Sequence, residues 1–210
     1  MLIALGIYTW IPEYRGYLRH EDRLIENLTA FFYVSTFFLS LLFLLKSKEH
    51  LKERIVISVA GLLGFLDELS FGDRIFGFKW PYIYGVQIDA AHDFFKLGYI
   101  LIKKPALLNT TYEYLLIGVC AMMAVIVALI FLYILIGIIS NSYLKQTYIL
   151  ALLFASLGFV SLIIDLEIVK NYALFTLEEL LEMNAAIALL FCCLSLYDSR
   201  LSKKPPVRST

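Results

Sequence analysis

The chain has 210 residues, 60% of them hydrophobic, and its 18 basic side chains are balanced by 18 acidic ones. Its apolar share and its mean hydropathy of +0.78 are well above those of an ordinary soluble domain, which argues against a water-soluble globular protein. Because the charges balance, no net field favours nucleic acid as a partner. The composition therefore predicts an all-α, polytopic transmembrane helix bundle with the lipid bilayer as its main partner.

Residues 1–23 form the first predicted segment, which we expect to lie at the membrane interface. The apolar stretch 1–10 is only about half as long as the roughly 20 residues that a spanning helix requires. It lacks the basic region and the small-residue cleavage site of a signal peptide. We therefore predict a short interfacial helix with Tyr8 and Trp10 as anchors. The alternative is that the beginning of the sequence is truncated and has lost part of a membrane-spanning helix.

Five long apolar runs follow, and each is about long enough to cross a bilayer. They occupy residues 24–45, 55–72, 114–139, 148–168 and 177–197. Together they define a transmembrane bundle at 24–198, followed by a tail at 199–210 that we expect to be cytoplasmic and disordered. The three cysteines lie inside these runs, where they are expected to be packing residues rather than disulfide partners.

The polar segment 73–112 raises the question of a further span. Its stretch 85–102 is nearly long enough to cross, but it contains the ionisable residues Asp89, His92, Asp93 and Lys96. Basic residues mark cytoplasmic loops, and they cluster at 46–54 and again at 200–208. Four spans between these clusters keep both on one side, whereas a fifth would separate them. We therefore predict a re-entrant or interfacial helix here, in an inner cell membrane with the amino terminus outside.

This topology places almost every buried-looking ionisable group at the outer level of the membrane. A carboxylate costs about 2.5–3.5 kcal/mol at the centre of a spanning helix, so such groups should face a partner, a cavity or a ligand. The predicted cluster, which either binds a ligand or pairs internally, consists of Asp67, Glu68, Asp73, Arg74, Gln87, Asp89, Asp93, Glu178 and Glu179. Within this cluster, Arg74 is either a structural counter-ion or a clamp for an anionic head group.

Metal-assisted chemistry fits these residue types. Asp89 and His92 have the i, i+3 spacing of metal ligands in helical bundles, and Glu178 with Glu182 could complete a divalent-metal site. A metal-bound water could then attack a lipid ester, amide or phosphodiester, with Ser70 and His92 as the catalytic residues that move protons. The sharper hypothesis is thus a protein that acts on or binds a lipid-linked substrate at the outer leaflet.

The alternative functions are not enzymatic. Carboxylates and histidine in membrane helices also serve as proton relays and cation sites, which would suit a transporter or carrier. An accessory subunit of a larger membrane complex, with structural buried charges, is a further possibility, and a homo-oligomer is compatible with each. The residues alone leave open whether the protein is an enzyme.

Three short motifs resemble those of a widespread group of prokaryotic integral membrane proteins. That group has an acid-acid-Ile-Ser-Trp-Gly-Gln-Arg-Ile helix end, a segment with Gln, an acid and Leu-His-Asn, and a Leu-Glu-Glu-x-x-Glu helix start. The matching segments here are 67–75, 87–93 and 177–182, and the acidic opening 21–26 also fits. The departures, which make this site more acidic, are Phe71 for Trp, Asp73 for Gln and Asp93 for Asn. The resemblance implies the architecture and the site residues but no activity, because none is established for the group.

A weaker likeness is to alkaline ceramidases and related seven-helix hydrolases, which hold zinc with three histidines. Asp67 and Ser70 match the start of their acid-x-x-Ser-x-x-Phe-His helix, but Arg74 stands where the histidine should be. Two glutamates stand where those enzymes have a late His-x-x-x-His pair. Because His92 is the one histidine that we expect at membrane level, zinc hydrolysis of that kind is disfavoured.

Overall fold

The computed structural model describes residues 24–46, 48–77, 79–90, 93–104, 111–141, 144–166 and 172–201. In chain order its elements are α3 (Leu24–Lys46), α4 (Leu51–Glu68), the 3-10 turn η2 (Ser70–Gly72), α5 (Asp73–Phe76), β1 (Tyr82–Ile83), β2 (Val86–Gln87), α6 (Asp93–Lys103), α7 (Thr111–Ser140), α8 (Lys145–Asp165) and α9 (Tyr172–Leu201). The predicted interfacial segment 1–23 lies outside the described residues, as does the predicted tail beyond 201.

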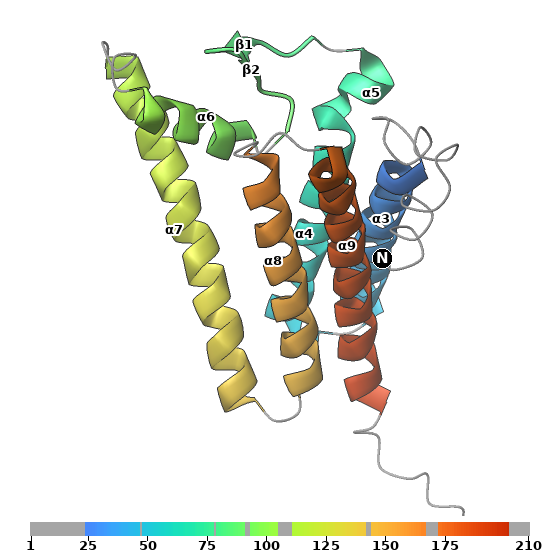
Figure 1. Ribbon diagram of the computed structural model, residues 1–210. Coiled ribbons are helices and arrows are strands. Elements are labelled where there is room, and N and C mark those ends of the chain that lie inside the picture. Colours follow the sequence, from blue (N-terminus) through green and yellow to red (C-terminus); the bar gives the residue numbers. More distant parts are fainter. Residues whose placement is uncertain are drawn as a thin grey trace, which may run out of the picture.

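Five of the described helices run along the bundle in alternating directions (Figure 1). Of these, α3, α7, α8 and α9 are long and apolar enough to cross a membrane. The fifth, α4, also qualifies if its continuation through Phe76, bent by 62°, counts as part of one span. These helices coincide with the five predicted apolar runs. The prediction of an all-α bundle with several spans is therefore confirmed.

The polar segment between α4 and α7 does not cross the bundle in the part that the structure describes. Its helix α6 has 11 residues, which at about 1.5 Å per residue is roughly half of the ~30 Å hydrocarbon core. It lies across the end of the bundle beside α7 (Figure 1). The stretch from 85 is not helical throughout, because β1 and β2 form an antiparallel hairpin whose turn residues Tyr84 and Gly85 both have positive φ. The prediction of a re-entrant or interfacial helix in this segment stays a prediction.

The helix at the centre of the bundle is α9, which packs against α8, α3 and α4. Half of the most apolar stretch of α9 is buried. The corresponding share is 11% for α7, which packs mainly on α8 and α6. Apolar side chains of α7 therefore point outward along most of its length, as expected for a helix in contact with lipid. Free thiols at Cys192 and Cys193 pack in the core around α9, in agreement with the prediction for the cysteines.

Small residues allow α3 and α4 to approach each other closely. A Cβ at Gly61 of α4 would lie 3.0 Å from the backbone nitrogen of Phe37 and from the carbonyl oxygen of Tyr33, both in α3. On the buried face of α3, Thr29 and Thr36 donate their hydroxyl hydrogens to the carbonyls four residues earlier, which satisfies them within the helix. Close backbone approach through small residues is typical of helix pairs in membranes.

The contact at Gly61 yields a test of the fold. Because backbone atoms face this position, Gly61→Leu should force α3 and α4 apart and lower stability by about 1–3 kcal/mol through overpacking. The matched control is Gly118→Leu, since nothing lies within 4 Å of a Cβ at that exposed position of α7. Thermal unfolding in detergent should show a lower midpoint for the first variant and an unchanged one for the second. Equal midpoints for the two variants would contradict the helix pairing.

Candidate functional site

The site begins where α4 breaks. Ser70, Phe71 and Gly72 have φ values of 48°, 46° and 95°, three consecutive residues in the left-handed region, and the helix axis turns there. Such a conformation costs on the order of 1–3 kcal/mol for each non-glycine residue and persists only where neighbours hold it. Trp80 provides that support, because its indole Nε1 donates to the Ser70 carbonyl at 3.1 Å and its ring meets the Phe71 ring edge-on. The break places the polar end of α4 at the end of the bundle.

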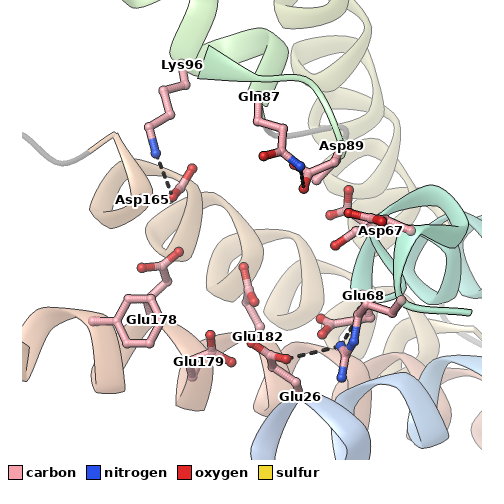
Figure 2. Close-up of a pocket in the computed structure, with 15 residues that line it drawn as sticks. Glu26, Asp67, Glu68, Gln87, Asp89, Lys96, Asp165, Glu178, Glu179 and Glu182 are labelled. Carbon is pink, nitrogen blue, oxygen red and sulfur yellow. Dashed lines mark hydrogen bonds and ion pairs between the residues drawn. The ribbon is translucent and has the colours of Figure 1, made fainter. Parts of the chain in front are cut away.

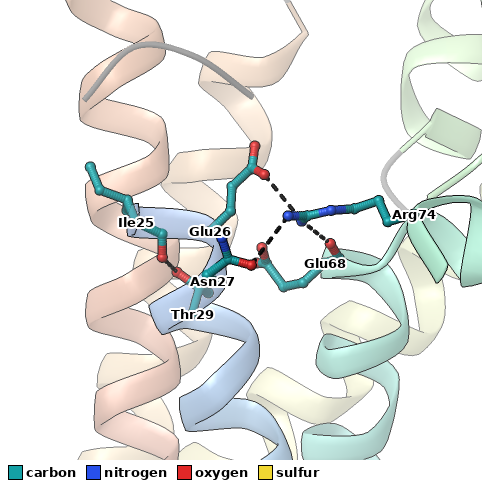
Figure 3. Close-up of polar contacts among 6 residues, drawn as sticks. All are labelled: Ile25, Glu26, Asn27, Thr29, Glu68 and Arg74. Carbon is teal, nitrogen blue, oxygen red and sulfur yellow. Dashed lines mark hydrogen bonds and ion pairs between the residues drawn. The ribbon is translucent and has the colours of Figure 1, made fainter. Parts of the chain in front are cut away.

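Arg74 connects this broken end to the start of α3 (Figure 3). Its Nη1 donates to the carbonyl oxygen of Glu68 at 2.6 Å and lies 3.1 Å from Oε2 of Glu26. Its Nη2 lies 3.4 Å from Oδ1 of Asn27. The Arg74 and Glu26 side chains are 17% and 16% exposed, so solvent screens this pair only in part. These contacts favour the structural counter-ion among the two roles predicted for Arg74.

A cavity of about 510 Å³ opens at this end of the bundle (Figure 2). Its wall combines α3, the end of α4, the hairpin segment, α6, the end of α8 and the start of α9. Nine acidic and two basic side chains line it, together with a serine, a glutamine and two apolar residues. The full lining consists of Glu26, Asp67, Glu68, Ser70, Asp73, Arg74, Gln87, Asp89, Ala90, Lys96, Asp165, Phe175, Glu178, Glu179 and Glu182.

Hydrogen bonds and an ion pair fix several of these side chains. Gln87 of β2 donates from Nε2 to Oδ2 of Asp89, just after the hairpin, at 2.9 Å. Ser161 of α8 donates to Oε1 of Glu182 at 2.9 Å, which joins α8 to α9. Nζ of Lys96 lies 3.6 Å from Oδ1 of Asp165, which joins α6 to the end of α8. The cavity is thus built from groups that also hold the helix ends together.

Most of the residues predicted from the sequence do meet in this cavity. Those that line it are Asp67, Glu68, Ser70, Asp73, Arg74, Gln87, Asp89, Glu178, Glu179 and Glu182. Asp93 does not, because its buried carboxylate accepts the backbone N–H groups of Asp89 and Ala90 at the start of α6. His92 lies outside the described residues.

The predicted cluster did not include Glu26, Lys96 or Asp165, although all three line the cavity. The sequence does contain the signal for two of them. Glu26 lies in the first turn of a spanning helix and Asp165 in the last turn of another, both at the membrane level of the predicted cluster. Lys96 belongs to the polar stretch 85–102, and the position of α6 over the end of the bundle brings it to Asp165.

The metal-site prediction involves Asp89, His92, Glu178 and Glu182. The three acids line the same cavity. Across the described residues, however, no group of three or more His, Cys, Asp or Glu side chains is arranged to hold a metal ion. Since the fourth predicted ligand, His92, is not among those residues, the metal site stays a prediction.

The hairpin beside the cavity is attached to α7. The hydroxyl of Tyr84, at the hairpin turn, donates to the carboxylate of Glu113 in the first turn of α7. This hydrogen bond raises the pKa of Tyr84 above its ordinary value. The contact helps to hold the hairpin and α6 over the end of the bundle.

Comparisons with protein-family models, curated proteins and solved structures found no match to this chain. The resemblance to the group of prokaryotic membrane proteins therefore stays a prediction, and so do the partners predicted beyond the bilayer.

The Arg74 contacts predict a specific loss of stability. Arg74→Gln should destabilise the protein by about 3 kcal/mol, because it leaves a partly buried carboxylate and a helix-end carbonyl without this donor. The control Lys79→Gln removes an exposed cation from the same end and should leave the unfolding midpoint unchanged. If Arg74 and Glu26 act as a pair, adding Glu26→Gln to Arg74→Gln should cost less than the two single changes summed. Additive losses would show that the two side chains do not stabilise each other.

Proposed function

We propose that this multi-pass membrane protein binds a cationic ligand in the acidic cavity, through an ammonium group carried by a lipid head group or by a free organic amine. The observation that supports the proposal is the composition of the wall, in which nine carboxylates and two cations surround about 510 Å³. The acidic side chains of the wall outnumber the basic ones by seven. Carboxylates crowded beside a membrane repel one another, so a bound cation lowers the free energy of the site.

The distribution of the carboxylates favours an ammonium group over a metal ion. The acids come from six segments around the cavity, and the described residues include no trio that converges as metal ligands do. An ammonium group donates up to three hydrogen bonds and needs no closed coordination shell. An amine with two or more positive groups could therefore contact acids on opposite walls.

The location of the cavity favours a lipid-linked ligand. It lies where the apolar helices α4 and α8 end and where α9 begins, which is the level of lipid head groups in a bilayer. The same chemistry would accept a free polyamine from the aqueous side. The two sources are separated by the experiment below.

Ligand binding is the function that the described side chains support best. Ser70 lines the cavity in the turn after α4, and the catalytic role predicted for Ser70 and His92 stays a prediction. Arg74, the predicted clamp for an anionic head group, is engaged by Glu26 and by a helix-end carbonyl. These contacts support a cationic ligand more than an anionic one.

We also propose that the cavity faces the outside of the cell. The opposite end of the bundle carries Lys46, Lys48 and Lys52, and basic residues concentrate on the cytoplasmic side of membrane proteins. Lys103 and Lys104 lie at the cavity end, so the bias in charge is modest and the orientation needs its own test.

The amine-binding proposal is tested with spermidine and with lipid nanodiscs. Spermidine should bind the purified protein in calorimetry, with an affinity that falls as salt is added, because the contacts are ionic. The double substitution Glu178→Gln and Glu179→Gln should weaken binding about tenfold, or 1.4 kcal/mol. Glu49→Gln, which removes an exposed acid at the other end, is the control and should change nothing.

A lipid source would be detected by native mass spectrometry. Protein from nanodiscs that contain equal phosphatidylethanolamine and phosphatidylglycerol should retain the amine lipid preferentially, and the double variant should lose that preference. Spermidine binding without lipid preference would assign the site to a free amine. If the double variant binds both probes as the unaltered protein does, the proposal is wrong.

The orientation is tested with fluorescent-protein fusions, which fluoresce only when the fused domain stays in the cytoplasm. A fusion at the carboxyl terminus should fluoresce, whereas a fusion to a chain ending at Lys104 should not. The reverse pattern would place the cavity on the cytoplasmic side.

A further inference from the structure

Apolar packing in the protein falls into two clusters. The larger cluster surrounds α9 and includes Ile134 of α7. The smaller one joins α6 to Leu116 of α7, and Ile83 and Ile88 of the hairpin segment pack against it. We call the hairpin segment and α6, residues 79–90 and 93–104, the flap. The main contacts of the flap are within itself and with α7, so it packs separately from the central helices.

The helix that carries the flap meets the rest of the bundle near its other end. There α7 packs on α8 so closely that a Cβ at Gly137 would overlap the Tyr148 ring. From residue 117 to residue 131 no side chain of α7 is buried, and α7 and α8 diverge toward the flap (Figure 1). Segments with few buried apolar contacts open at a lower free energy than the core does. The flap is therefore attached to an arm that can move without disrupting the core around α9.

On its other side the flap contacts α4 through Trp80. The indole Nε1 of Trp80 donates to the Ser70 carbonyl at 3.1 Å, and its ring meets the Phe71 ring edge-on. Both partners have the left-handed backbone conformation, which a non-glycine residue keeps only where its surroundings hold it. A movement of the flap that withdraws Trp80 thus removes support from the break in α4. The flap also contacts α8, through Lys96 and Asp165.

The cavity lies between these two packing units. Gln87, Asp89, Ala90 and Lys96 line it from the flap, and the rest of its lining comes from α3, α8, α9 and the end of α4 with its break. Ser70 belongs to this second part of the wall, and it is also the residue that Trp80 contacts. The width of the cavity is therefore set by how the flap docks on the bundle.

We infer that the flap is a gate of the cavity and that Trp80 is its latch. When Trp80 leaves Ser70 and Phe71, the break relaxes from its left-handed conformation and the flap moves away from α4. The cavity then opens to solutes from the aqueous side. This inference concerns access and goes beyond the proposed function, because it holds whatever the cavity binds.

The test is the rate at which a water-soluble carbodiimide modifies the cavity acids Asp67 and Glu182 in the full chain, read by peptide mass spectrometry. Trp80→Ala should raise this rate at least about fivefold, because the rate follows the fraction of open molecules. Trp80→Phe, which keeps a ring but loses the N–H donor, should raise it less.

The matched control is Tyr82→Ala. It removes an exposed aromatic side chain from the same hairpin, and the Tyr82 hydroxyl bonds within the hairpin, to Gln87. The control should leave the labelling rates unchanged, and Glu49 at the other end of the bundle should react equally in every variant. Equal labelling of the cavity acids in Trp80→Ala and Tyr82→Ala overturns the inference. Since no ligand is present, that result would leave the proposed function standing.

Hydrogen exchange separates opening of the gate from unfolding. In Trp80→Ala, amide exchange should accelerate both at 69–76 and at 79–90, while the core of α9 at 185–196 stays protected. Acceleration confined to 79–90 would show that the break does not depend on the latch, and would contradict the inference. If Trp80→Ala also loosens α9, the comparison is made with Trp80→Phe, and unchanged labelling of the cavity acids in that variant overturns the inference.

Discussion

The guanidinium of Arg74 lies between the broken end of α4 and the first turn of α3, where it donates to the Glu68 carbonyl and pairs with Glu26. The Arg74 and Glu26 side chains are only 17% and 16% exposed, so these charged groups need partners within the protein. The contact ties the break in α4 to α3, and both sides of this joint, Glu26 and Glu68, line the cavity.

The opposite end of the α3 and α4 pair uses the same chemistry. Arg54, in the first turn of α4, is 2% exposed, and its Nη1 donates to the Phe43 carbonyl near the end of α3 at 2.7 Å. Ser40 of α3 donates in return to the Arg54 carbonyl at 2.8 Å. An arginine therefore meets the negative end of a helix dipole at each end of this pair, and Gly61 keeps the two helices close between them. The acidic cavity therefore lies at one end of a helix pair, α3 and α4, that arginine contacts join at both ends.

The apolar runs predicted the spans because a stretch of about 20 mostly apolar residues, with its charges confined to the ends, has one stable solution in a bilayer, the spanning helix. The cluster of acids was also predictable, since acids at the ends of such runs must share one membrane level. The contacts that individual charged side chains make were less predictable. Asp93 was assigned to the cluster, yet its carboxylate accepts backbone N–H groups, and Arg54 was counted among cytoplasmic charges, yet it is buried. Periodicity does not reveal which local hydrogen bond a charged side chain satisfies.

We propose the cavity as a receptor for an ammonium group, with Arg74 as the cation that ties its wall together. The most direct measurement is carbodiimide labelling of carboxylates, read out by peptide mass spectrometry, with and without a saturating diamine whose nitrogens are tertiary. The account predicts protection of Asp165, Glu178 and Glu179, while Glu49 at the other end is labelled equally in both samples. Equal labelling of the cavity acids in both samples would contradict it.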